Sequence, residues 1–536
     1  MRSPAKSRRK RNEAGVALLI AIFALMLVSV VAIALVVSTG TDSSLAGNYR
    51  TASGAYYASL AGLEEARGRL LWKNPDFVNK TGTYTNILFD SSAVMPNWGL
   101  TTVLYITNPA TVDPTNLAPS NPYRDIEYTS EFGIPITSAA SYTTPSVSPL
   151  GTIPGPSYKW VRINAVTQKA LNIDVNGTGS GTTDGVDLLY YDPAHLNASN
   201  QPAPSLVVGP PPANSDWVQV LEITALAVTA NGSTRLLQYL VAPLIISPDV
   251  ADLSFPAALT LDNGQFGNSS TMTFNPPNGF QINGVDACST PPFPQLPNAV
   301  ASLAYTSNAN HWYLYSQANS DSSDFPGAPL FNPPPHPYNA TMPSLVNATA
   351  PSPMLLKQSW LTPQSLDAAM QDVVNNADVI LGPTGTYYTG SPQNFQGQDL
   401  FNAAPAMSLT NPMTIVVNGN LTLNGVNVSN PVGYGLLLVT GTLNYHPSAS
   451  WNGIILVVGQ GNMVIGGHYG SGGILGSAFV AQTRDGSGNL LGNLAASYTY
   501  GGGPLGAGIT YSSCFVRTAA GPLTYKVLSF HEIPQN

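Results

Sequence analysis

The sequence predicts a mostly β protein of the α+β class, in which one long N-terminal helix precedes a β-rich head. Three observations support this prediction: an apolar run near the N-terminus, a composition rich in turn-forming residues, and a glycine-punctuated repeat near the C-terminus. The chain has 49 glycines and 46 prolines among 536 residues, while 43% of its residues are apolar and only 9% are charged. Such a chain can bury a core and is not disordered.

The N-terminal helix is predicted to cross a membrane once. Six Lys or Arg residues lie among the first eleven, and residues 16–37 follow with Ser29 as their only polar member. As a helix, this run would span ~33 Å, which exceeds the ~30 Å hydrocarbon core of a bilayer. Positively charged flanks stay in the cytoplasm, so the head is expected outside it. A cleaved secretory signal and a plain single-span anchor are the alternatives.

The helix is expected to continue beyond the membrane to about Trp72, because no proline interrupts it. A mostly apolar stripe at spacings of three and four predicts that this extended helix, over residues 16–72, docks on its own head. The stripe consists of Leu45, Tyr49, Ala52, Tyr56, Ser59, Leu63, Ala66 and Leu70. A self-associating coiled coil is the weaker alternative, because Ser59 and two alanines make a thin seam.

Residues 11–70 resemble the N-terminal region of type IV pilins, and most closely that of the PilX-type minor pilins. The stretch AGNYR at residues 46–50 and the segment AYYASLAGLEEA after it carry the closer likeness. The resemblance implies that a prepilin peptidase removes residues 1–15 as a basic leader by cutting between Gly15 and Val16. It also implies that the new N-terminal amine of Val16 is methylated.

The resemblance further implies a place at the end of a fibre. Major pilins carry glutamate at the fifth mature position, where this chain has Ile20. A carboxylate in hydrocarbon is costly unless it pairs with the N-terminal ammonium of a neighbouring subunit, and Ile20 cannot form that pair. The expected function is therefore that of a minor pilin in a type IV pilus-like system, which primes assembly and displays its head at the fibre tip or cell surface.

The partners expected from this resemblance are other minor pilins, the pilus assembly platform, the prepilin peptidase and the inner membrane. The alternative is a membrane-anchored surface adhesin or carbohydrate-binding protein that never enters a fibre. After residue 15 the chain carries 14 basic and 27 acidic residues. This acidic balance argues against a nucleic-acid partner, which requires clustered Lys and Arg.

The head is predicted to contain two units. Residues 73–250 form a β-rich region, in which the sequence ANGS at residues 230–233 lies between two apolar runs and predicts a β-hairpin. Residues 251–536 are expected to form a β-helical module that a loop and helix insertion over residues 291–411 interrupts. Within the insertion, Thr362 as N-cap and Pro363 at the first turn predict one helix.

The C-terminal repeat predicts a short right-handed β-helix over residues 412–482, with a β-sandwich as the alternative. Apolar strands with glycine corners start at Thr414, Leu436, Ile454 and Ile474, about 20 residues apart. Residues 258–284 are expected to add coils to it. The core positions Val439 and Val457 should then be buried.

The two cysteines, Cys288 and Cys514, are too far apart in the sequence to form a C-x-x-C metal or redox motif. In an oxidising envelope they are expected to form one disulfide. Two buried free thiols are the alternative. The bond would tie the start of the interrupted module to its end.

No catalytic site, metal site or cofactor is expected. The segment GGGPLG at residues 501–506 lacks the βαβ context of a dinucleotide site. His446 and His468 fall near equivalent corners of adjacent coils, but solvated turns explain them better. The repeat at 412–482 contains no Asp or Glu, which argues against a glycosidase on those coils. The chain is therefore expected not to be an enzyme.

Two further patterns permit a binding site but do not require one. Asp184, Asp187 and Asp192 offer oxygen ligands for calcium, but without a regular ligand spacing. Aromatic side chains in the repeat could stack on sugars or equally fill the core; they are Tyr434, Tyr445, Trp451 and Tyr469.

Overall fold

The computed structural model describes residues 11–534, with internal gaps. The residues outside its description are 1–10, 72, 75–76, 80–81, 84–97, 101, 110, 133–138, 144–157, 179–184, 196, 198–202, 213–214, 247–254, 264–271, 276–278, 289–299, 308–310, 319–322, 328–343, 349–355, 386, 388–391, 468–469, 503–507, 522 and 535–536. Most of the leader, Trp72, Asp184, His468, Tyr469 and most of the segment GGGPLG therefore lie outside the described residues.

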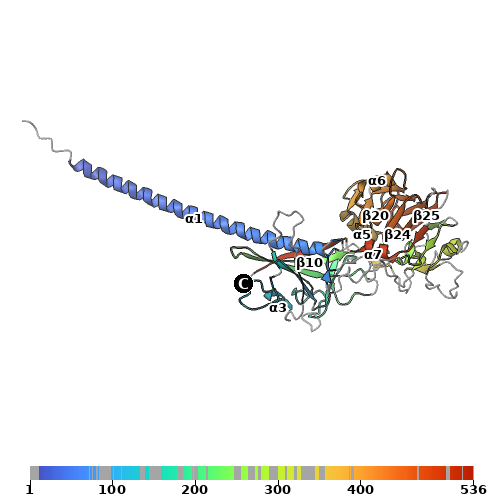
Figure 1. Ribbon diagram of the computed structural model, residues 1–536, viewed down its shortest axis with the longest axis horizontal. Helices are drawn as coiled ribbons and strands as arrows, with labels where there is room; N and C mark the ends of the chain where they lie inside the picture. The colour runs from blue at the N-terminus through green and yellow to red at the C-terminus, as the bar shows by residue number, and fades with distance from the viewer. Residues whose placement is uncertain are drawn as a thin grey trace, which may run out of the picture.

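The chain begins with one continuous helix, α1 (Arg11–Arg69), of 59 residues. Figure 1 shows its N-terminal part projecting far from the head, while its C-terminal part lies on the head. Hydroxyl groups inside the projecting part bond to its own backbone: Ser29 Oγ donates to Leu25 O, and Thr39 Oγ1 donates to Leu35 O. Such bonds hide polar groups that hydrocarbon would not solvate.

The first unit of the head is a six-stranded sheet in the order β27-β10-β9-β5-β3-β4. Neighbouring strands are antiparallel except for β3 and β4, which are parallel. Its strands are β3 (Val103–Thr107), β4 (Ala139–Thr143), β5 (Tyr158–Ala165), β9 (Leu221–Val228), β10 (Thr234–Leu244) and β27 (Thr524–Ile533). The hairpin predicted at residues 230–233 is confirmed, because it joins β9 to β10.

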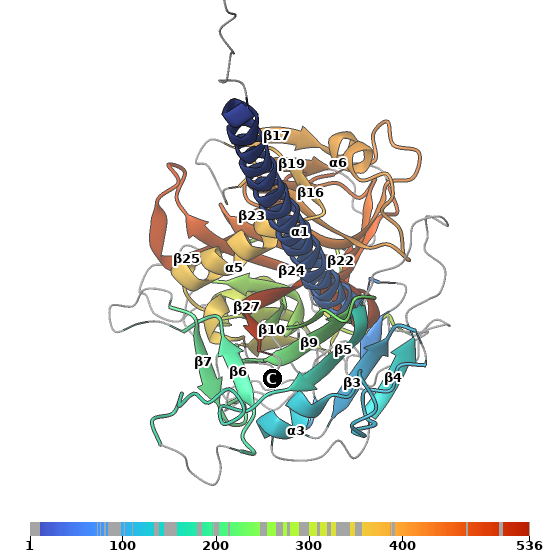
Figure 2. The same cartoon turned by 90° about the vertical axis from the view of Figure 1, so that its left-hand side faces the viewer.

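Smaller elements complete this unit. Helix α3 (Ile126–Phe132) lies on the opposite side of the sheet from α1 (Figures 1 and 2). A three-stranded sheet follows the order β7-β6-β8, and β1 pairs with β2. Their bounds are β1 (Val78–Asn79), β2 (Gly82–Thr83), β6 (Leu189–Asp192), β7 (Ser205–Val208) and β8 (Val218–Gln219).

The second unit is a large, nearly closed, barrel-like sheet that contains two rows of strands. Within each row, neighbouring strands are parallel, and the rows meet where β24 pairs with β25 antiparallel. One row contains β16 (Val379–Leu381), β18 (Met413–Val417), β20 (Val432–Val439), β22 (Ser450–Gly459) and β24 (Gly473–Arg484). The other contains β17 (Gln393–Gln396), β19 (Gly419–Leu423), β21 (Thr442–Tyr445), β23 (Asn462–Ile465) and β25 (Leu490–Tyr500). Parallel rows of this kind differ from the antiparallel sheets of a sandwich.

The rows are extended by strands from elsewhere in the chain. Strand β11 pairs with β24, β12 with β25, and β13 with β26, in each case parallel. Strands β14 and β15 continue outward from β11. Their bounds are β11 (Ala257–Asp262), β12 (Met272–Phe274), β13 (Ile282–Asn283), β14 (Ala301–Tyr305), β15 (Leu345–Asn347) and β26 (Gly508–Thr510). Residues 258–284 thus add strands to the sheet formed by the repeat.

The observed register agrees with three of the four predicted repeat starts. Thr414 pairs with Leu436, and Leu436 pairs with Ile454. The partner of Ile454 is Ser477, however, and the predicted start Ile474 pairs with Trp451 instead. Ser477 does not look like a core position in the sequence because it is polar. Its hydroxyl donates to Ala257 O at 2.8 Å, where β11 joins the row.

The insertion and the last strand of the chain lie in other parts of the fold than the sequence predicted. The predicted insertion over residues 291–411 contributes β14, β15, β16 and β17 to the barrel-like sheet, in addition to loops and helices. The final strand β27, expected in the β-helical module, pairs with β10 in the first sheet. The short strand β17 has the sequence QNFQ, which carries no apolar alternation by which it could be recognised.

Helices cover the second unit. The predicted helix is confirmed as α5 (Pro363–Asn375), with the Thr362 side chain accepting a hydrogen bond from Ser365 N. The others are α4 (His311–Ala318), the 3-10 helix η4 (Gln358–Trp360), α6 (Gly397–Ala403) and α7 (Ser513–Ala520). Val439 and Val457 are fully buried in the core of this unit, as predicted.

Candidate functional site: the projecting helix and its seat on the head

The projecting part of α1 presents apolar side chains to its surroundings. The most apolar stretch of 18 residues in this helix has a mean hydropathy of 3.2, and the helix is long and apolar enough to cross a membrane as an anchor or a signal sequence. Val16 is 61% exposed and Ile20 is 62% exposed. Their large apolar neighbours up to Val37 are exposed as well. The predicted cleavage position between Gly15 and Val16 therefore lies on the uncovered part of the helix.

The predicted docking stripe is covered only in its second half. Ser59, Leu63, Ala66 and Leu70 are buried against the head, whereas Leu45 is 70% exposed and does not contact it. Residues 16–50 are exposed, residues 51–53 are half-buried, and Ala55 is the first fully buried residue. Residues 16–50 thus form an uncovered rod of about 50 Å at ~1.5 Å per residue.

The buried half of the stripe lies on β5, β9 and β10. Ser59 Oγ donates a hydrogen bond to Ala225 O at 2.6 Å, so the one polar residue of the buried seam is satisfied. Gly62 allows the closest approach: a Cβ atom added there would lie 3.0 Å from Tyr158 Cγ and from a methyl group of Val161. Glycine at this position lowers the stability of an isolated helix, but it permits the close contact between the helix and the sheet.

Polar and aromatic contacts fix the end of the helix. Arg67 pairs with Glu64 at 2.5 Å and donates to Tyr525 O at 3.2 Å. The Tyr239 hydroxyl donates to Glu64 Oε1 at 3.1 Å; burial, and then this carboxylate, raise the pKa of Tyr239 to about 12. Phe530 contacts the Tyr239 ring edge-on. Tyr525 and Phe530 belong to β27, so the last strand of the chain forms part of the seat of the first helix.

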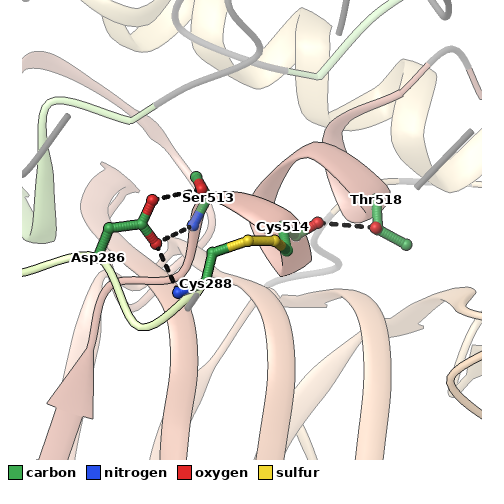
Figure 3. Close-up of a disulfide and its surroundings, with 5 residues drawn as sticks. All are labelled: Asp286, Cys288, Ser513, Cys514 and Thr518. Carbon is green, nitrogen blue, oxygen red and sulfur yellow. Dashed lines mark hydrogen bonds between the residues drawn. A yellow bond between two sulfur atoms is a disulfide. The ribbon is translucent and has the colours of Figure 1, made fainter. Parts of the chain in front are cut away.

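The two cysteines are joined by a disulfide in the structure, with their Cα atoms 5.7 Å apart. Figure 3 shows the bond linking the segment after β13 to α7. The Asp286 carboxylate holds both sides together, because it accepts from the backbone N–H of Cys288 and of Ser513, each at 3.0 Å. The Ser513 hydroxyl donates to the same carboxylate at 2.5 Å. No local signal in the sequence indicates this role of Asp286, because its contact with Ser513 spans 227 residues.

The aromatic residues proposed as sugar-binding positions mostly fill the core. Tyr445 and Trp451 are fully buried, and their polar atoms donate to Ala449 O and Gly435 O, respectively. Tyr434 is half-buried, and its ring lies 6.4 Å from that of Phe515. Neither buried ring can stack on an external sugar.

The remaining sequence candidates do not converge on a site among the described residues. His446 lies over Gly466, where an added Cβ atom would approach its ring to 2.6 Å. Asp192 accepts from Ala194 N at 3.0 Å and lies 3.9 Å from His195 Nδ1. Asp187 is not part of any group of three potential metal ligands in the described part of the chain.

A cavity of about 90 Å³ lies between the two units. Its lining includes Asp216 from the first unit and Lys357, Ser359 and Trp360 from the second. Asp216 accepts from Ser359 N at 3.0 Å, and burial raises the pKa of Asp216 although the positive charge of Lys357 opposes this. These contacts link the two units of the head.

No family model matches the chain, and no curated protein matches it. Among solved structures, the chain shows a likeness to the competence-associated pilin ComZ from Thermus thermophilus, at 12% sequence identity over 68% of this chain and 91% of that one. The TM-score is 0.15, a value that does not show a shared fold.

Proposed function

We propose that this protein is a PilX-type minor pilin of a type IV pilus-like system, which primes fibre assembly and remains at the fibre tip. The observation that carries the proposal is the single helix α1, whose first part is apolar and uncovered and whose last part is seated on the head. A subunit of a helical fibre needs both parts, because the first part packs among other subunits and the second carries the load of the head.

The proposed processing follows from the order of residues along this helix. A prepilin peptidase cuts between Gly15 and Val16 at the cytoplasmic side of the inner membrane, and Val16 is then methylated. The head lies outside the cytoplasm. The proposed partners are other minor pilins and the assembly platform. Ile20 supports the tip position, because it leaves no buried carboxylate that would require the ammonium of another subunit.

The head is proposed to be a rigid display surface without catalytic activity. Its barrel-like unit lies at the end of the molecule away from the projecting helix (Figure 1). We further propose that this unit is a short right-handed β-helix. The parallel rows support that proposal, since the pairs Thr414–Leu436, Leu436–Ile454 and Ile454–Ser477 give coils of 22, 18 and 23 residues.

The first experiment determines the N-terminus of the protein isolated from the cell membrane. Mass spectrometry is expected to find a chain that begins with methylated Val16. Gly15→Arg is expected to leave the leader attached, whereas Asn12→Arg adds the same charge within the leader and should be cleaved normally. An intact leader in the wild-type protein, or a start near residue 40, would contradict the proposed processing.

The second experiment locates the head on fibres. Immunogold labelling is expected at fibre ends, and Ile20→Glu is expected to give no gain in assembly. Dense labelling along the shaft would exclude the tip position. Labelling of the cell surface without any fibre association would instead support a membrane-anchored adhesin.

A further inference from the structure

Outside the proposed assembly site, the first unit contains a buried arginine surrounded by carboxylates. Arg162, on β5, is fully buried and forms ion pairs with Asp125 at 2.8 Å, Glu127 at 2.7 Å, Glu131 at 3.4 Å and Glu222 at 2.5 Å. Four carboxylates thus share one guanidinium. Buried charges of one sign are costly unless they are compensated, so this cluster requires additional positive charge or bound protons.

Three of the carboxylates converge on one point. Glu127 and Glu131 are one turn apart on α3, and Glu222 projects from β9 of the sheet below it. One oxygen from each of the three lies within 4.8 Å of the others. Oxygens that bind the same calcium ion at 2.3–2.6 Å can be at most about 5 Å apart, so one ion can reach all three.

A second observation does not depend on the clustering. Glu222 is fully buried, and one of its oxygens, Oε1, accepts hydrogen bonds from Arg162 Nη2 and Thr224 Oγ1. The other oxygen, Oε2, is buried and has no hydrogen-bond partner in the described part of the chain. An unsatisfied carboxylate oxygen at zero exposure is expensive, and a bound cation would satisfy it.

We propose that Glu127, Glu131 and Glu222 bind a calcium ion between α3 and β9. All the protein ligands are carboxylate oxygens, which calcium prefers, and Glu127 and Glu131 remain 17% and 10% exposed, so water can complete the coordination. Arg162 would keep its bonds to Asp125 and to Glu222 Oε1, and it would share Glu127 and Glu131 with the ion. The ion would fix α3 to the sheet face opposite the seat of α1.

The test uses the full-length protein in detergent after treatment with a chelator. Isothermal titration with calcium chloride is expected to show one saturable site. The unfolding temperature should rise with calcium and much less with magnesium. Glu131→Gln removes one of the three carboxylates and should bind calcium at least tenfold more weakly than the wild type.

A matched variant separates this cluster from the acidic turn near residue 190. Asp187→Asn also removes one carboxylate from the first unit and should retain wild-type calcium binding. If Glu131→Gln does not fold, Glu131→Asp keeps the charge but withdraws it by one methylene, and it should bind calcium at least tenfold more weakly. The proposal is overturned if the wild type shows no saturable calcium binding, or if the foldable variant at position 131 binds as tightly as the wild type.

Discussion

Replacing Val457 with aspartate tests whether the two parallel rows enclose a dry core. Val457 is fully buried in β22, and its register partners are Val439 on β20 and Val480 on β24. Both partners are also fully buried. An aspartate at this position would therefore have apolar neighbours on both adjacent strands and no cation to pair with in the same register.

The expected loss of stability follows from three contributions. Losing a fully buried valine side chain costs about 1.5 kcal/mol or more. Keeping the carboxyl neutral at pH 7, when its unfolded pKa is about 3.9, costs about 4 kcal/mol at ~1.4 kcal/mol per pKa unit. The unpaired carboxyl group adds about 1 kcal/mol or more. The total, at least about 6 kcal/mol, is comparable to the whole stability of a typical domain, so the second unit should unfold.

The pH dependence gives the sharpest readout. Because burial raises the folded-state pKa of the introduced carboxyl group above its unfolded value, protonation favours the folded state, and the penalty is largest at high pH. Lowering the pH from 7 to 4 should therefore remove most of the roughly 4 kcal/mol that is due to ionisation. Thermal unfolding of the full-length variant and the wild type at both pH values measures this difference.

Two controls isolate the effect of burial. Val457→Thr nearly preserves the shape but adds no charge, so it should cost about 1–3 kcal/mol with no pH dependence. Asn444→Asp places the same carboxylate on half-exposed β21 and should change the unfolding temperature little. The reasoning fails if Val457→Asp unfolds within a few degrees of the wild type at pH 7, or if its deficit is the same at pH 4.

The remaining predictions concern the disulfide and the seat of the helix. Replacing Cys288 and Cys514 together with serine should destabilise the second unit by up to about 5 kcal/mol in the chain-entropy model, because the bond closes a loop across 226 residues. Dithiothreitol should lower the unfolding temperature of the wild type but not of this double variant; an equal shift in both would contradict the prediction. Gly62→Leu should displace the helix from β5 and expose Arg67 to trypsin. Gly54→Ala is the control, because a Cβ atom added at Gly54 meets no atoms within 4 Å. It should stabilise the helix by up to about 1 kcal/mol without changing trypsin cleavage. Protection of Arg67 from trypsin in the Gly62→Leu variant would refute the proposed seat.

The sequence predicts those parts of the fold whose signals repeat locally. The 22-residue apolar run, the hairpin between β9 and β10, and helix α5 each follow from patterns within about 30 residues. The repeat reveals the in-register positions Thr414, Leu436 and Ile454 because each begins an apolar strand. It fails at Ser477, where a polar residue satisfies a carbonyl of β11 and so breaks the apolar pattern.

Contacts between distant segments could not be predicted in the same way. The carboxylates around Arg162 come from α3 and β9, and no spacing in the sequence marks them as neighbours. The pairing of β27 with β10 joins strands that the whole second unit separates in the sequence, so no local pattern predicts it. The stripe on α1 correctly indicates an apolar face, but periodicity alone does not say that Leu45 lies beyond the reach of the head.

The return of the last strand to the first sheet connects the seat of the helix to completion of the fold. Strand β10 leads into the second unit, and β27 leads back from it to lie antiparallel to β10. Arg67 donates to Tyr525 O, and the Tyr56 ring contacts Phe530, so α1 contacts residues that are synthesised after the whole second unit. Contacts across such sequence separations form late, because chain closure costs entropy before the contact is gained. Under the proposed function, α1 would therefore make all of these contacts only in a chain whose head has finished folding. The ladder between β10 and β27 would then serve the same end, because it keeps the second unit fixed relative to the first while the helix is pulled into a fibre. The disulfide would instead hold the second unit itself together, because both of its cysteines lie within that unit.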